Sequence, residues 1–402
     1  MYFSRVYDII IIGVNMKKDL NKMDKPLLFL IIIFCLFGLI MVYSSSSVAA
    51  ILRYHQSSSH FFIKQLIFMI ISFVFGFIFI LRIPTSKYKY LSWLGIIGIN
   101  VVLALLLVYG TITNHVQSWF YIGPMSIQPS EFAKSIIIIF LACYYNSFLK
   151  KKDYKIFKIF IPVGFAAIAF FLTALQPDLG SAVIITGITF FIFISLPISK
   201  NNLIKLIKIS SVLLIILLVA VISQKDKLFN EEQLARLNYK EPCTRYMEDS
   251  GYQVCNGFIA INNGGLLGVG IGNSTQKYLY LPESHTDFIF AIIVEELGMV
   301  SGILVVVAYA ILLIRILKIA KSSHNLRNSI ICYGTFWYIA LHVIINLCGV
   351  LGLWPLTGVP LPLLSYGGSH TMNILIMLFF VLRVSIENKN TEYKMELKKL
   401  AS

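Results

Sequence analysis

Residues 287–314 read DFIFAIIVEELGMVSGILVVVAYAILLI, a long apolar run that carries Asp287 at its start and Glu295 and Glu296 inside it. At about 1.5 Å per residue, a helix of this length is long enough to cross a hydrocarbon core of about 30 Å. A carboxylate at the centre of a transmembrane helix costs roughly 2.5–3.5 kcal/mol. The run therefore predicts a membrane span, and its acids predict binding, catalysis or ion pairing close to its start.

The composition of the whole chain agrees with a membrane protein. Of its 402 residues, 57% are hydrophobic and only 13% are charged, with a mean hydropathy of +0.79, whereas a soluble domain needs far more surface charge. We predict an all-α polytopic membrane protein in which residues 1–402 form one integral membrane domain. Its ten candidate spans are residues 26–44, 65–83, 90–110, 134–149, 159–175, 181–198, 209–223, 287–314, 329–350 and 370–386.

The basic residues predict the orientation of these spans. Ten spans place both termini on one side, and the segments on that side hold 25 of the 34 Lys and Arg residues. Cytoplasmic segments carry such an excess, so we expect cytoplasmic tails at residues 1–25 and 387–402 and one long extracellular loop at 224–286. The net charge of +15 is then a signal of topology, and a nucleic-acid partner is not expected.

Three outer segments depart from the regular pattern of spans. They are residues 111–133, the long loop, and residues 351–369, which read LGLWPLTGVPLPLLSYGGS and are rich in Pro and Gly. Irregular backbone at membrane depth is tolerated only where protein or a water-filled cavity surrounds it. We therefore expect residues 351–369 to be re-entrant or tightly folded, and we expect a functional site on the outer face.

Two of the six cysteines, Cys243 and Cys255, lie in the long outer loop. In an oxidising exterior they either pair or remain as two free thiols, and a pair would stabilise the fold by ~3 kcal/mol. The sequence leaves both alternatives open. The cysteines within the spans are read as small apolar core residues.

For several charged residues at the ends of spans, a structural role is an alternative to a functional one. Glu131 and Lys134 lie three positions apart on one helical face, which predicts a mutual ion pair. Asp178 directly precedes a span, as a helix cap does. Glu295 and Glu296 are adjacent and cannot share a helical face, so at least one is expected to point into the bundle, for pairing or for function.

Asp287 differs from these residues because a polar loop with Glu283 and His285 directly precedes it. Burial and a neighbouring carboxylate raise the pKa of such a group, while a helix N-terminus lowers it. A carboxylate placed in this way suits a general base near neutral pH. Helix capping is the alternative reading.

The histidines and glycines show no standard cofactor motif. The seven histidines lack metal-ligand spacing, and the glycine run at residues 262–274 follows no strand-helix-strand pattern. Dinucleotide binding is excluded on this basis. Closely packed amides in the glycine run are instead expected to suit an anion such as pyrophosphate.

Five stretches resemble the SEDS family of bacterial cell-wall proteins, which comprises FtsW, RodA and SpoVE. They occur in the order found in that family and span nearly the whole chain; the first and fourth resemble FtsW or SpoVE most closely. The stretches are GLIMVYSSSS (38–47), SWFYIGPMSIQPSEFAK (118–134), QPDLGSAVI (176–184), GYQVCNGFIAINNGGLLGVGIGNSTQKYLYLPESHTDFIFAIIVEELG (251–298) and PLTGVPLPLLSYGGS (355–369).

The resemblance implies ten transmembrane helices and a peptidoglycan glycosyltransferase in the bacterial cytoplasmic membrane, with its active site facing outward. Such an enzyme joins lipid II into β-1,4 glycan strands and releases undecaprenyl pyrophosphate. The essential aspartate of the family falls on Asp287, and a divalent cation, Mg²⁺ or Mn²⁺, would offset the charge of the pyrophosphate. The candidate substrate-binding residues are Glu283, His285, Lys277, Arg236, Glu131, Lys134, Trp119, Asp178, Ser365 and Gly367.

The resemblance also implies a class B penicillin-binding protein as partner, together with proteins of the divisome or elongasome. Septal synthesis in cell division is the expected role. The alternatives are a RodA-like elongation polymerase, a lipid II flippase or a structural scaffold. One position departs from the family, since many relatives carry Glu where this chain has Leu279.

Overall fold

Helices cover nine of the ten predicted spans in the computed structural model, which describes residues 20–113, 116–122, 125–150, 156–198, 204, 240–247 and 249–400. The predicted span at 209–223 and the candidate Arg236 lie outside the described residues. The nine helices are α2 (Lys25–Leu52), α3 (His60–Phe75), α4 (Tyr88–Tyr109), α5 (Pro129–Phe148), α6 (Ile161–Leu175), α7 (Leu179–Ile194), α12 (Ile289–Lys321), α13 (Leu326–Val350) and α14 (Gly368–Leu400).

Short helical turns extend three of these helices. A π-helical turn at Gly76–Ile80 continues α3, and 3₁₀ turns at Thr85–Lys87 and Ile156–Phe160 precede α4 and α6. With these turns included, seven helical segments of the described chain are long and apolar enough to cross a membrane; α5 and the 16-residue α7 are not among them. Helical structure and long apolar segments confirm the predicted polytopic helical class.

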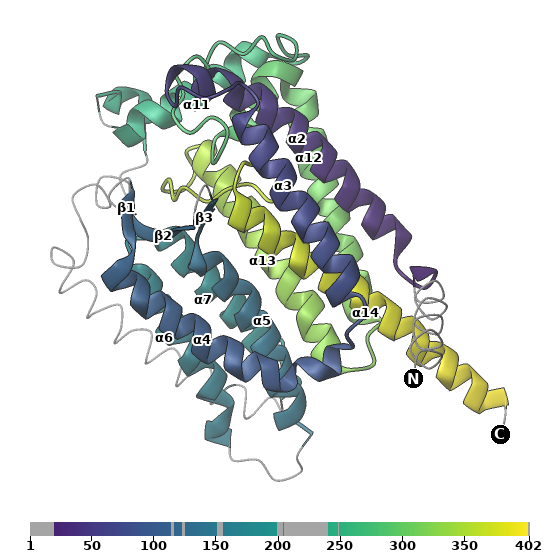
Figure 1. Ribbon diagram of the computed structural model, residues 1–402. Coiled ribbons are helices and arrows are strands. Elements are labelled where there is room, and N and C mark those ends of the chain that lie inside the picture. Colours follow the sequence, from purple (N-terminus) through teal and green to yellow (C-terminus); the bar gives the residue numbers. More distant parts are fainter. Residues whose placement is uncertain are drawn as a thin grey trace, which may run out of the picture.

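The helices lie in two neighbouring groups (Figure 1). One group contains α2, α3, α12, α13 and α14, and the other contains α4 to α7. α13 joins the groups, because it packs against α5 and α7 on one side and against α12 and α14 on the other. Polar side chains on α13 are therefore placed where both groups meet.

The start of α2 and the long C-terminal helix α14 meet at one end of the bundle (Figure 1). Asp24 caps α2 by accepting a hydrogen bond from the amide of Leu27, and its own amide donates to Ser385 Oγ over 3.1 Å. The Asp24 carboxylate also pairs with Arg315 Nη2 at 2.7 Å. This arrangement agrees with the predicted placement of both termini on one side. The predicted tail from residue 387 continues as helix to Leu400.

A small sheet interrupts the all-α architecture in the predicted irregular segment 111–133. It consists of β1 (Thr111–Thr113), β2 (Val116–Ile122) and β3 (Met125–Ile127) in antiparallel order. Thr111 lies opposite Trp119, and Phe120 lies opposite Ile127. Aromatic and β-branched residues in β2 favour a strand, which the analysis of apolar runs does not detect.

The described part of the long outer loop is folded. A 3₁₀ turn at Pro242–Arg245 leads into α11 (Asp249–Gly264), which packs against α12. A disulfide joins Cys243 to Cys255, so the structure takes the paired alternative. The disulfide fixes the turn against the first part of α11.

A break at Gly298 divides α12 into two parts. Gly298 has a φ of +84°, and the glycine-rich loop lies beside the break, where Val269 and Gly270 donate to the carbonyls of Glu295 and Glu296 at 3.0 and 2.9 Å. A Cβ on Gly298 would lie 2.2 Å from the Leu266 carbonyl oxygen, so only glycine fits. These two amides of the glycine run therefore bond to the broken helix, and anion binding by the run stays a prediction.

Residues 351–367 form no regular helix or strand, yet several of their apolar side chains are buried. Leu361, Leu363 and Leu364 have no exposed surface, and Tyr309 donates a hydrogen bond to the Pro362 carbonyl. The protein surrounds this irregular backbone, as predicted for residues 351–369.

Candidate functional site

Asp287 lies two residues before α12 and is 6% exposed. Its Oδ1 accepts a hydrogen bond from Thr286 Oγ1 at 3.2 Å, and its main-chain oxygen accepts one from Asn346 Nδ2 at 2.7 Å. A Cβ on Gly358, which has a φ of +68°, would lie 4.0 Å from Asp287 Oδ2. The glycine therefore leaves this side of the carboxylate without the van der Waals contact that a larger residue would make.

Glu283 shares a hydroxyl group with Asp287. Thr286 Oγ1 lies 2.9 Å from Glu283 Oε2 as well as 3.2 Å from Asp287 Oδ1, and Arg53 approaches Glu283 Oε1 at 3.7 Å. The Arg53 pair is solvent-exposed enough to contribute little stability. Glu283 and Asp287 thus come together, as the sequence predicted.

His285 is buried and faces aromatic rings. Its ring centroid lies 4.6 Å from that of Phe61 and 5.8 Å from that of Tyr366, and its carbonyl accepts from the Tyr366 amide at 2.8 Å. Burial lowers the pKa of His285 from its ordinary value of 6.5 to about 4, while the Glu283 charge opposes that shift and the Arg53 charge adds to it. The imidazole is therefore neutral at pH 7. The main-chain carbonyl of His285 ties the loop to residue 366.

The backbone around this site is strained at three residues that are not glycine. Leu279, Glu283 and Leu363 have φ values of +68°, +51° and +64°. Such left-handed conformations cost of order 1–3 kcal/mol each and persist only where surrounding structure enforces them. Glu283 lies in the loop that precedes Asp287, and Leu363 lies in the segment 351–367, whose Gly358 faces Asp287 Oδ2, so the packing holds this region in a defined shape.

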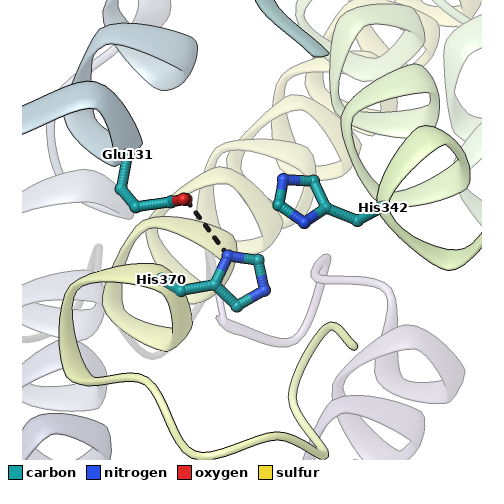
Figure 2. A group of neighbouring side chains, drawn as sticks. All are labelled: Glu131, His342 and His370. Carbon is teal, nitrogen blue, oxygen red and sulfur yellow. Dashed lines mark hydrogen bonds and ion pairs between the residues drawn. The ribbon is translucent and has the colours of Figure 1, made fainter. Parts of the chain in front are cut away.

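A second polar cluster joins α5, α13 and α14 (Figure 2). Lys134 Nζ lies 2.6 Å from Glu131 Oε1, which confirms the predicted ion pair, and 3.3 Å from His342 Nε2. His370 Nδ1 and the Tyr338 hydroxyl each lie 3.1 Å from Glu131 Oε2. All five side chains are buried, so the two helix groups are joined by a fully desolvated network.

Glu131, His342 and His370 could offer ligand atoms that lie within 4.8 Å of one another. The ammonium group of Lys134 already supplies positive charge between Glu131 and His342. Mg²⁺ and Mn²⁺ also prefer oxygen ligands to two imidazoles. The donor set therefore does not fit the divalent cation expected for a leaving pyrophosphate, and Lys134 takes the role of the cation in this cluster.

Glu295 and Glu296 are both fully buried, although adjacent residues point to different faces. Glu295 accepts hydrogen bonds from the glycine-rich side, including 2.9 Å from Thr275 Oγ1 and a contact with Ser274 Oγ. Glu296 accepts from Ser44 of α2 at 2.7 Å and pairs with Lys277 at 3.0 Å. Lys277 is thus paired with Glu296 and also donates to the Gly272 carbonyl oxygen at 2.6 Å.

The remaining candidates lie in structural contacts of their own. Asp178 caps α7 through the amide of Ser181 at 3.1 Å and accepts from Gln128 and Ser130. Trp119 lies on β2 and is partly exposed. Ser365 Oγ accepts from the Leu361 amide at 2.8 Å, while the Gly367 amide donates to Gln65 Oε1 at 3.2 Å.

The structure adds polar residues that the sequence analysis did not single out. His342, Asn346, His370 and Gln65 lie inside or beside apolar spans and are buried. A polar side chain within a membrane span is expensive, and that rule was applied only to carboxylates and lysine. Applied to amides and imidazoles, it would have found all four, although not their partners.

Comparisons with known proteins agree with the fold and the motifs. The family model described as "Cell cycle protein", for FtsW, RodA and SpoVE, matches residues 25–390. The chain is 38% identical to the probable peptidoglycan glycosyltransferase FtsW of Bacillus subtilis (strain 168) over 391 residues, which covers 96% of each chain. It is 36% identical to stage V sporulation protein E of the same organism over 379 residues, covering 91% of this chain and 98% of the relative.

Solved structures show the same fold. The rod shape determining protein RodA of Thermus thermophilus is 23% identical, with a TM-score of 0.61 and coverage of 90% of this chain and 96% of that chain. A chain of a peptidoglycan synthase complex, described as coordinating polymerization and crosslinking, gives a TM-score of 0.70 at 23% identity and covers 91% of this chain and 98% of that chain.

Proposed function

Because this chain belongs to the FtsW/RodA/SpoVE family of cell cycle proteins, we propose that it polymerises lipid II with Asp287 as the general base. The chain is a peptidoglycan glycosyltransferase, the activity named for its FtsW relatives, and it is a multi-pass membrane protein. Septal synthesis in cell division is the proposed role, since the FtsW of Bacillus subtilis is similar over 96% of the chain. Elongation, as named for RodA, is the alternative.

The position of Asp287 carries the proposal for the catalytic residue. Its carboxylate lies between the loop of Glu283 and Gly358, where a Cβ would lie 4.0 Å from Asp287 Oδ2. A general base must be held where it can reach the proton that it removes, and the essential aspartate of the family falls on this position.

The proposed reaction forms one bond and breaks one bond. The 4-hydroxyl oxygen of the acceptor GlcNAc attacks the anomeric carbon of the donor MurNAc, and the bond from that carbon to the pyrophosphate oxygen breaks. Asp287 takes the hydroxyl proton, and undecaprenyl pyrophosphate leaves with the electron pair. Inversion at the anomeric carbon gives the β-1,4 bond.

The proposed divalent cation, Mg²⁺ or Mn²⁺, would neutralise the leaving pyrophosphate. Glu283 and Asp287 offer the carboxylate oxygens that such ions prefer, and Thr286 Oγ1 contacts both groups. This donor set fits the ion better than the cluster that contains Lys134 and two histidines.

Three further proposals concern place and partners. The site faces outward in the bacterial cytoplasmic membrane, since the predicted cytoplasmic segments lie at the opposite end of the helices. A class B penicillin-binding protein crosslinks the strands in a complex with this chain, in the manner of the synthase complex that shares its fold. Other divisome proteins assemble around that complex.

A lipid II flippase remains the rival from another class, and the ionic groups at the inner end argue against it. Asp24 pairs with Arg315, and Glu387 accepts from Arg383 at 3.2 Å and from the Thr85 amide at 2.7 Å. These groups join the ends of helices to one another, whereas a transporter uses such groups along a path. Movement of fluorescent lipid II across proteoliposomes without polymerisation would favour the flippase.

Substitution of Asp287 tests the proposal. We expect Asp287→Asn, purified with its transpeptidase partner, to lose about 10²–10⁴-fold in the rate of glycan polymerisation, because the amide cannot accept the proton. Gel analysis of polymerised lipid II measures the rate, and size-exclusion chromatography verifies folding. Asp24→Asn, a matched change at the helix start at the opposite end, should retain activity; full activity of Asp287→Asn would refute the assignment.

A further inference from the structure

Asn346 on α13 holds the backbone of Asp287, and we propose that it is a positioning residue for the reaction. The inference rests on the proposed function, in which Asp287 is the base. Asn346 is 4% exposed and lies in the helix that joins the two helix groups. Its amide bonds to the main chain of Asp287, and its effect is to place the carboxylate.

The side-chain amide of Asn346 spans two segments that are remote in sequence. Its Nδ2 lies 2.7 Å from the Asp287 carbonyl oxygen and 2.8 Å from the Val359 carbonyl oxygen. An amide NH₂ has two donor hydrogens, so each carbonyl receives one. The reverse orientation would set Oδ1 against two acceptors, and the contacts therefore fix the orientation of the side chain.

These two hydrogen bonds set the surroundings of the carboxylate. The Ala291 amide donates to the Phe288 carbonyl oxygen and not to that of Asp287. The Asp287 carbonyl oxygen therefore lies outside the hydrogen-bond pattern of α12 and accepts from Asn346 instead. Val359 directly follows Gly358, whose Cα faces Asp287 Oδ2. One amide thus fixes both the residue that carries the base and the backbone opposite that base.

His342 extends the same arrangement by one helical turn. Its Nε2 lies 3.3 Å from Lys134 Nζ and must accept, because an ammonium group only donates. Its Nδ1 then carries the proton and donates to the Pro360 carbonyl oxygen at 3.3 Å. α13 therefore holds the carbonyls of two consecutive residues, Val359 and Pro360, between Asp287 and the cluster of Glu131 and Lys134.

A displacement of about 1 Å at a reacting group costs on the order of 10²-fold in rate. Loss of both Asn346 donors should therefore lower kcat for polymerisation by about 10–100-fold while KM for the polyprenyl-diphosphate-linked disaccharide stays within about twofold. A residue that only stabilises the fold would lower the amount of folded enzyme and would leave kcat per folded molecule unchanged.

The experiment compares Asn346→Leu with Asn388→Leu in the purified full-length chain with its transpeptidase partner. Asn388 is also buried on a helix, and its Nδ2 donates to the Ile319 carbonyl oxygen at 3.1 Å and to Ser322 and Ser323 at the opposite end of the bundle. Both variants lose buried amide donors, so their thermal stabilities should fall together. Only Asn346→Leu should lose kcat.

Asn346→Ser keeps one hydroxyl donor and serves as a second variant if Asn346→Leu fails to fold. Its kcat should lie between those of the wild type and Asn346→Leu. Wild-type kcat in either folded variant would overturn the inference, as would an equal loss of kcat in Asn388→Leu. Asp287→Asn is measured in parallel: if it is active, the proposed function fails, whereas an inactive Asp287→Asn beside an unimpaired Asn346→Leu refutes the positioning role alone.

Discussion

Two acidic regions at the start of α12 solve the problem of a buried carboxylate in different ways. Glu295 and Glu296 are saturated, since hydroxyl groups, amides and Lys277 reach their oxygens from the glycine-rich loop and from α2. The main chain of Asp287 is held by Asn346, its Oδ1 accepts from Thr286, and Gly358 lies opposite its Oδ2. The first region, which we call the anchor region (residues 264–277 and 295–298), stabilises the break in α12.

The difference indicates which acid reacts. A carboxylate whose lone pairs all accept strong hydrogen bonds is a weak base and binds nothing more without losing those bonds. The backbone of Asp287 is held by Asn346, and the resemblance places the essential aspartate of the family on this residue. The contacts of the anchor region give it a structural role, whereas the chemical role of Asp287 is our proposal.

The strongest test of this comparison within the anchor region is Glu296→Gln. Removal of the charge leaves Lys277 buried without its partner, and breaking a buried pair costs about 3–5 kcal/mol. Thermal unfolding in detergent should show this loss, while the polymerisation rate per folded molecule stays unchanged. The double variant Glu296→Leu with Lys277→Met removes both charges and should recover most of the stability.

An inactive but fully stable Glu296→Gln variant would break the comparison, because Glu296 would then act in the chemistry. The same outcome for Lys277→Met would return Lys277 to the substrate-binding residues proposed from the sequence.

The disulfide next to the anchor region gives a smaller effect. Cys243 and Cys255 are 12 positions apart, and closure of such a loop stabilises a fold by ~3 kcal/mol in the chain-entropy model. Replacement of both by Ser should lower the unfolding temperature, whereas Cys348→Ser, at a free and half-buried cysteine, should not. Two freely labelled thiols at 243 and 255 in intact cells without reductant would contradict the pairing.

The smallest effect comes from His285 beside Asp287. The folded state holds the pKa of His285 at about 4, below its ordinary 6.5, so the unfolded chain binds the proton first as the pH falls. The contribution of His285 to stability is present above pH 6.5 and is lost towards pH 4, with about 2 kcal/mol lost at pH 5.

His285→Phe keeps a ring against Phe61 and Tyr366 and should flatten the change of unfolding temperature between pH 7 and pH 5 relative to the wild type. An identical pH dependence in the two proteins would show that His285 is not buried in its neutral form. The surroundings of Asp287 would then be more open to water than the 4% exposure of the His285 side chain indicates.

Much of the site was predicted from the sequence, for local reasons. Glu131 and Lys134 share a helical face and pair, and Asp178 precedes a helix and caps it, because spacing along one helix fixes both contacts. The pairing of Lys277 with Glu296 was not predicted, since it depends on how a glycine-rich loop meets α12, and its role in substrate binding stays a prediction. The hydrogen bonds from that loop to the break in α12 were not predicted for the same reason.

The sequence by itself determined the polytopic helical class and nine of the ten spans, whereas the outward orientation of the acids stays a prediction. A membrane span and an excess of basic residues are both properties of the composition of one continuous stretch, so each can be recognised from the sequence alone. Only the tertiary structure decided that Asn346 reaches Asp287 and that Glu131 meets His342 and His370. These contacts join residues far apart in the chain, and they depend on which helix faces meet when α13 packs between its neighbours, a choice that no single stretch encodes.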